Sequence, residues 1–105
     1  MNFDEYQTKA RTTRTASADE AYALLGLSGE VGEVHSLIAK QIRDHHLTED
    51  ELRLNLKKEL GDVLWFISAI ADDFGLSLTE IAQANIEKLK KRKASGTIQG
   101  SGDNR

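Results

Sequence analysis

Two pairs of acidic residues, each separated by three positions, are the residues of this sequence best suited to chemistry. Glu30 and Glu33 form the first pair, and Glu59 and Asp62 form the second. Each pair lies in a stretch whose apolar residues recur at helical spacing, so the four carboxylates point toward what should be a core. Burying unpaired carboxylates is unfavourable by several kcal/mol unless a cation accompanies them. Because the sequence contains no cysteine, the set suits a hard divalent ion, Mg²⁺ or Mn²⁺, better than zinc.

The positions of these acids around their helices favour a shared site. At roughly 100° per residue, Glu30 and Glu59 fall within the apolar stripes of their helices, and Glu33 and Asp62 fall at the edges. The first pair has no Lys or Arg three or four residues away, and the second pair has only one, so pairing along the helix is mostly unavailable. Interhelical salt bridges remain an alternative, with three possible donors: Lys40, Lys88 and Arg92.

A basic segment later in the chain is a possible complement to the acids. Asn85, Lys88 and Arg92 lie along one side of the predicted fourth helix. In one interpretation they contact a phosphate beside the metal-binding acids. In the other, Asn85 is a core amide with its hydrogen bonds satisfied, and Lys88 and Arg92 are solvated bases at a helix end. Carboxylate-bound Mg²⁺ with nearby Lys and Arg is typical of phosphoryl chemistry. No histidine stands three residues after any of the three glutamates, which disfavours a di-iron centre.

Four helices are expected to position these residues, because a capping residue followed three positions later by an acid occurs four times. The four pairs are Asn2–Glu5, Ser17–Glu20, Thr48–Glu51 and Ser77–Glu80. They predict four helices, over residues 3–14, 18–44, 49–74 and 78–93. Gly75 and Gly96 are expected to end the third and fourth helices. Since the later linkers are short, we expect an all-α, antiparallel four-helix bundle.

The length of the chain limits the size of its core. A sequence of 105 residues forms one domain, which buries only about 65% of the surface that the unfolded chain exposes. We therefore expect the bundle to assemble through subunit contacts. Residues 1–94 should form the all-α domain. Residues 95–105 contain three glycines and should form a tail that is flexible unless a ligand or a neighbouring subunit orders it.

Charge and hydropathy argue against two classes of partner. The net charge of −3 and the small number of aromatic residues, six in all, disfavour a nucleic-acid-binding surface. No apolar run approaches the roughly 20 residues that span a bilayer, and the N-terminus lacks the apolar core of a secretory signal. Together with the absence of cysteine, these features predict a cytoplasmic protein without a membrane partner.

Three sequence segments together resemble the MazG-like nucleotide pyrophosphohydrolases. They are LSGEVGEV at residues 27–34, KELGDVLW at residues 58–65 and ANIEKLKKR at residues 84–92. The resemblance covers residues 17–93 and implies an all-α enzyme that hydrolyses a nucleoside triphosphate, often a deoxynucleotide, to the monophosphate and pyrophosphate with Mg²⁺. It also implies a homodimer or homotetramer whose sites lie close to subunit contacts.

The resemblance assigns roles to individual residues. It implies that Glu30, Glu33, Glu59 and Asp62 hold the metal ions and that one of them orients or deprotonates the attacking water. It implies that Asn85, Lys88 and Arg92 contact the phosphates. Many relatives begin the first motif with two adjacent glutamates, whereas this chain has Gly29 before Glu30. The number of metal ions and the identity of the general base therefore stay open.

Two further questions stay open in the sequence. The residues that recognise the base are not fixed by a motif, and the candidates Tyr6, Gln7, Trp65 and Phe66 are equally suited to packing. The chain also fits a different class, a non-catalytic helical interaction protein. In that alternative the acids form interhelical salt bridges, and the basic run KLKKRK at residues 88–93 binds an acidic partner.

Overall fold

The computed structural model describes residues 1–105 and contains four α-helices and no strand, which confirms the predicted all-α class. The helices are α1 (Phe3–Thr12), α2 (Glu20–Asp44), α3 (Glu49–Asp73) and α4 (Leu78–Ser95). No helix has both the length and the apolar character that a bilayer crossing requires.

The helix starts follow from local capping chemistry. Asn2, Thr48 and Ser77 each accept a hydrogen bond from the backbone N–H three residues later, as predicted. The predicted cap of the second helix was wrong: α2 is capped by Asp19, whereas Ser17 lies in the preceding turn. A carboxylate at this position accepts a hydrogen bond from a backbone N–H that has no partner within the helix, and it also interacts favourably with the positive end of the helix dipole.

The helix ends lie within two residues of their predicted positions. Gly75 and Gly96 follow α3 and α4 with φ of 66° and 74°, a left-handed conformation that glycine adopts at little cost, so both predicted stops are confirmed. At the end of α2 the same conformation is taken by His45, with φ of 49°. The chain can therefore reverse sharply after each of the three long helices.

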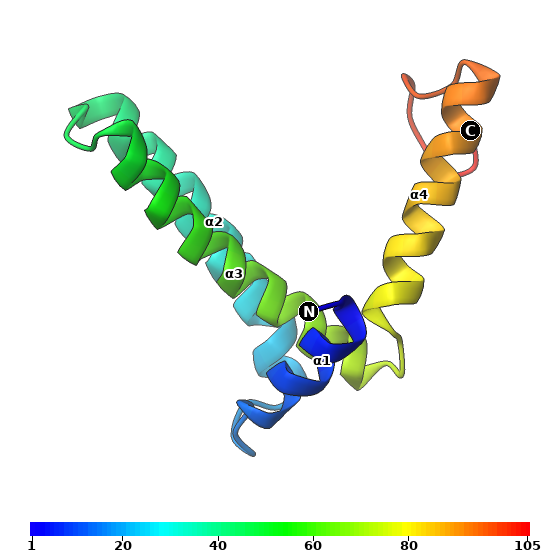
Figure 1. Ribbon diagram of the computed structural model, residues 1–105, viewed down its shortest axis with the longest axis horizontal. Helices are drawn as coiled ribbons and strands as arrows, with labels where there is room; N and C mark the ends of the chain where they lie inside the picture. The colour runs from blue at the N-terminus through cyan, green and yellow to red at the C-terminus, as the bar shows by residue number, and fades with distance from the viewer.

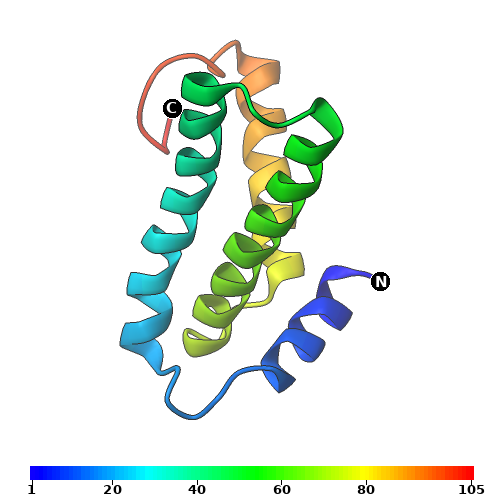
Figure 2. The same cartoon turned by 90° about the vertical axis from the view of Figure 1, so that its left-hand side faces the viewer.

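The helices form an antiparallel hairpin with a separate arm. α2 and α3 pack side by side along their length, and α1 crosses α3 near its C-terminal end (Figure 1 and Figure 2). α4 contacts α1 and leads away from the hairpin, so the molecule has a V shape in Figure 1. The helix packing is consistent with a bundle, but within one chain the fourth helix does not lie along the other two long helices.

The core is small for a chain of this length. Only nine of the 105 residues are buried, and they lie mainly where α1 meets α3. Many large apolar side chains stay exposed on both arms of the V, among them Leu25, Ile42, Leu54, Leu60, Ile86 and Leu89. Single exposed apolar residues are ordinary, but here they occur in large number on both arms, which is unusual for a chain with so small a core.

One contact explains a glycine inside α2. A Cβ built on Gly26 would overlap the ring of Phe66, a buried residue of α3. Glycine destabilises a helix by about 1 kcal/mol relative to alanine, so a packing reason for it is expected. Here the missing side chain lets the ring of Phe66 approach the backbone of α2.

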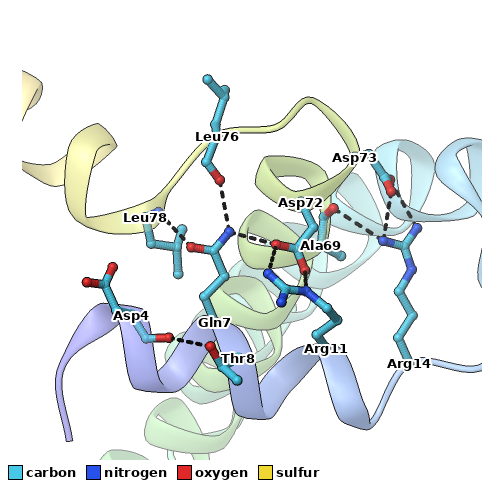
Figure 3. A network of polar contacts seen from close by, with 10 residues as sticks. All are labelled: Asp4, Gln7, Thr8, Arg11, Arg14, Ala69, Asp72, Asp73, Leu76 and Leu78. Carbon is cyan, nitrogen blue, oxygen red and sulfur yellow. Dashed lines mark hydrogen bonds and ion pairs between the residues drawn. The ribbon is translucent and has the colours of Figure 1, made fainter.

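A polar joint fixes α1 to the junction between α3 and α4 (Figure 3). The buried amide of Gln7 donates to Asp72 Oδ1 at 2.7 Å and to the carbonyl of Leu76 at 2.9 Å. Its oxygen accepts the N–H of Leu78, the first residue of α4, at 2.9 Å. Arg11 adds a two-point contact to Asp72 at 2.8 and 2.9 Å. One side chain of α1 thus supplies a partner for an N–H that a helix start leaves unpaired.

A second ion pair ties the loop after α1 to the same end of α3. Arg14 donates to both carboxylate oxygens of Asp73 at 2.9 and 3.0 Å, and its Nε donates to the carbonyl of Ala18 at 2.7 Å. Both charged side chains are largely shielded from solvent. This pair fixes the loop after α1 to α3, whereas the contacts of Gln7 reach the first residue of α4.

Candidate metal centre

Three of the four predicted acids converge on the face of the α2–α3 hairpin. Glu30 comes from α2, and Glu59 and Asp62 come from α3, one turn apart. Each offers a carboxylate oxygen, and these three oxygens lie within 4.8 Å of one another. Glu30 and Glu59 are half-buried, and Asp62 is exposed. The helical projection thus placed the first acid of each pair correctly on the inner side of its helix.

No base neutralises these carboxylates within the chain. None of the ion pairs or side-chain hydrogen bonds in the structure involves Glu30, Glu33, Glu59 or Asp62. The pKa of Glu30 is raised above its ordinary value, chiefly by burial and then by the charges of Asp62, Glu59 and Glu33. A bound cation would relieve the repulsion that the neighbouring carboxylates exert on ionised Glu30.

Glu33 lies beside the cluster without belonging to it. Its side chain is exposed one turn further along α2, and its carboxylate is not among the three that lie within 4.8 Å of one another. Its charge still contributes to the raised pKa of Glu30. The structure therefore brings three predicted metal ligands together and leaves the fourth at the edge.

The predicted phosphate residues do not approach the acids of the same chain. Asn85 is exposed on α4, where it lines an open cavity of about 370 Å³ with Ile81, Ala84 and Lys88. Lys88 Nζ and Arg92 Nη2 instead contact a carboxylate of the C-terminal tail. Because α4 diverges from the hairpin, one chain presents the acids and the bases on separate arms (Figure 1).

Of the base-recognition candidates, three are committed to packing. Gln7 belongs to the polar joint, Trp65 donates from Nε1 to Thr13 Oγ1 at 2.8 Å, and Phe66 is buried against α2. Tyr6 differs, because burial and then the charge of nearby Asp62 raise its pKa.

Tyr6 also lines a feature that the sequence analysis missed. It borders an open, largely apolar cavity of about 370 Å³ together with Met1, Asn2, Phe3 and Leu64. The aromatic residues three positions apart in the first helix were the available signal, since residues at i and i+3 share a helix face. Because the charge of Asp62 acts on Tyr6, this cavity lies near one acid of the cluster.

Comparison with known proteins gives one family match and two similar proteins. A family model described as the MazG nucleotide pyrophosphohydrolase domain matches residues 19–96. The chain is similar to Gene 37 protein of Mycobacterium phage L5, with 42% identity over the whole of both chains. It is also similar to the uncharacterized protein YvdC of Bacillus subtilis (strain 168), with 33% identity over 63% of this chain and 68% of that protein. No solved structure matches it.

Proposed function

The chain belongs to the MazG nucleotide pyrophosphohydrolase family, and on that premise we propose that it is a Mg²⁺-dependent nucleoside triphosphate pyrophosphohydrolase. Its reaction would convert an NTP or dNTP to the monophosphate and pyrophosphate. The observation that carries the proposal is the cluster of Glu30, Glu59 and Asp62, three carboxylates from two helices with no base to neutralise them. This set supports a bound cation and hence phosphate chemistry.

The donor set fits a hard divalent ion. All the available ligand atoms are carboxylate oxygens, which suit Mg²⁺ first and Mn²⁺ as a substitute. Glu30, Glu59 and Asp62 would hold the ion, and Glu33 would reach it by a change of rotamer or through water. When bound, the metal neutralises phosphate oxygens and lowers the pKa of a bound water.

The carboxylates of this chain have two further tasks in the reaction. They orient the attacking water, and one of them accepts its proton. Position 29 cannot take part, because this chain has a glycine where many relatives have an acid. The hairpin holds Glu30 opposite Glu59 and Asp62, so substrate and water would meet between α2 and α3 rather than in a loop. Residues 1–94 would form this domain, with residues 95–105 as the tail.

The phosphate side of the site would come from a second copy of the chain, in a homodimer or homotetramer. Asn85, Lys88 and Arg92 suit phosphate oxygens, but the α4 that carries them leaves the hairpin of its own chain. Apolar side chains are exposed on both arms, and the acids of one arm complement the bases of the other. An α4 docked into the V of another copy satisfies both observations. The absence of cysteine fits a reducing compartment such as the cytoplasm.

A substrate panel tests the proposed reaction. The purified protein is incubated with each standard NTP and dNTP in the presence of Mg²⁺, Mn²⁺ or EDTA, and pyrophosphate and orthophosphate are measured separately. We expect pyrophosphate and a monophosphate from at least one nucleotide, only with metal. Glu59→Gln should abolish the activity, whereas Glu49→Gln, an exposed acid on the same helix, should retain it. Inactivity on every nucleotide, or full activity of Glu59→Gln, would overturn the proposal.

A further inference from the structure

The C-terminal tail folds back onto α4 (Figure 1). We call residues 96–105 the C-terminal clasp. Its reversal uses glycines in left-handed backbone conformations, with φ of 74° at Gly96, 123° at Gly100 and 86° at Gly102. The N–H of Thr97 donates to the carbonyl of Arg92 at 2.7 Å, which starts the turn away from the helix.

Two arginines hold the clasp in place. From α4, Arg92 Nη2 donates to the carbonyls of Gly102 and Asp103 at 3.3 and 2.9 Å. From the clasp itself, Arg105 donates to the carbonyls of Thr97 and Gly102 and to that of Ile98. These contacts use backbone acceptors, so part of what holds the clasp does not involve the side chain of Asp103.

The side chain of Asp103 has a different role. One of its oxygens, Oδ1, accepts from both Lys88 Nζ and Arg92 Nη2, each at 3.2 Å. Asp103 is 80% exposed, whereas Arg92 is only 6% exposed. The pKa of Asp103 is lowered by its hydrogen bonds to Lys88 and then Arg92, so this carboxylate is ionised at neutral pH. A single exposed oxygen thus serves two of the bases that suit phosphate.

More cationic than acidic side chains lie around this oxygen. A cavity of about 320 Å³ lies between α4 and the clasp. Four cationic side chains line it, against two acids: Lys88, Lys91, Arg92 and Arg105 against Glu87 and Asp103. The buried Nε of Arg92 has no hydrogen-bond partner. The excess of cationic over acidic side chains in the lining favours an anion that carries more charge than one carboxylate.

We propose that Asp103 occupies the phosphate position of Lys88 and Arg92 in the free chain, so that it competes with a phosphate or pyrophosphate group for these two bases in the cavity. The use of this binding in the reaction rests on the proposed function, since the anion would then be substrate phosphate or the pyrophosphate product. An exposed ion pair is weak, whereas a phosphate carries more charge and accepts two parallel hydrogen bonds from one guanidinium. The phosphate therefore displaces Asp103, and the clasp changes its contacts when the anion binds.

Calorimetry with the full chain tests this competition without any nucleotide. Inorganic phosphate and pyrophosphate are titrated separately in EDTA, so that the acidic cluster holds no metal, into the wild type and Asp103→Asn. We expect Asp103→Asn to bind pyrophosphate about threefold to fivefold more tightly, the factor that an exposed ion pair is worth. Lys88→Gln should bind more weakly. Asp50→Asn, an exposed acid with the same change of net charge, should bind as the wild type does.

The amide NMR signals of residues 97–105 give an independent measurement. Pyrophosphate should shift them in the wild type, because Asp103 is displaced. If Asp103→Asn binds more weakly than the wild type, Asp103 positions the two bases and does not compete. If millimolar pyrophosphate neither releases heat nor shifts these signals, the cavity is not an anion site. Either result overturns the inference, whereas nucleotide hydrolysis is still judged by the substrate panel. If no nucleotide is hydrolysed in that panel but pyrophosphate binding behaves as expected, only the proposed function is overturned.

Discussion

Replacing Glu30 by Gln should make the metal-free protein more stable. Glu30 shares its site with Glu59 and Asp62, and carboxylate oxygens of the three lie within 4.8 Å of one another. At that distance two unit charges in water repel by about 0.9 kcal/mol, and Glu30 has two such neighbours. Salt at physiological strength roughly halves this repulsion, so the neutral amide should stabilise the fold by about 1 kcal/mol. The melting temperature would rise by about 4 to 8 °C.

The stabilisation by Mg²⁺ should be much larger in the wild type than in Glu30→Gln. At a concentration ten times its dissociation constant, a ligand of the folded state stabilises it by about 1.4 kcal/mol. The wild type should gain this stability, whereas Glu30→Gln should gain little. The pH dependence gives a second check. The folded-state pKa of Glu30 is raised, so the metal-free wild type should lose stability as pH rises from the ordinary glutamate range through that pKa, and Glu30→Gln should not.

Thermal melts at fixed protein concentration, with EDTA or Mg²⁺, measure both effects. Glu49→Gln, which removes an exposed acid outside the cluster, is the control and should change stability only slightly. Suppose instead that Glu30→Gln is less stable than the wild type in EDTA and that Mg²⁺ stabilises neither protein. The acids would then be partners in salt bridges, as the alternative of a helical interaction protein requires.

Two packing predictions concern the elements that hold the site. Gly26→Ala should destabilise the fold by about 1 to 2 kcal/mol in urea denaturation, because the new methyl group overlaps Phe66 and this outweighs the gain in helix propensity. Gly32→Ala, with open space at its Cβ, should be neutral or stabilising; equal losses in both variants would refute the argument. Gln7→Ala should lower the free energy of unfolding by about 1 to 3 kcal/mol, because the buried N–H of Leu78 loses its acceptor. An unchanged midpoint of urea denaturation would show that the polar joint does not stabilise the fold.

Features that depend on neighbouring residues could be predicted from the sequence. Three of the four predicted caps follow from a side chain and an N–H three residues apart, and only Ser17 was wrong, since Asp19 caps α2. The convergence of Glu30 with Glu59 and Asp62 follows from helical periodicity and the antiparallel order of two long helices.

Features that depend on distant residues could not be predicted. The direction of α4 is set by hydrogen bonds between residues about 70 positions apart, such as that from Leu78 N to Gln7, and helical periodicity contains no information about them. The same holds for Lys88 and Arg92, whose partner Asp103 lies in a glycine-rich segment without a regular period. The sequence shows the cations and, further along the chain, the acid, but it does not indicate the turn that brings them together.

The polar joint around Gln7 has a consequence for how copies of the chain would associate. Its hydrogen bonds with Asp72, Leu76 and Leu78 all lie within one chain. The angle between the two arms of the V is therefore fixed without any contact to a second chain. Association is costly when flexible parts must be immobilised on contact, and a preformed angle removes that part of the entropy loss. The first helix, which contributes none of the predicted metal or phosphate ligands, would therefore act as a preorganising element that strengthens assembly.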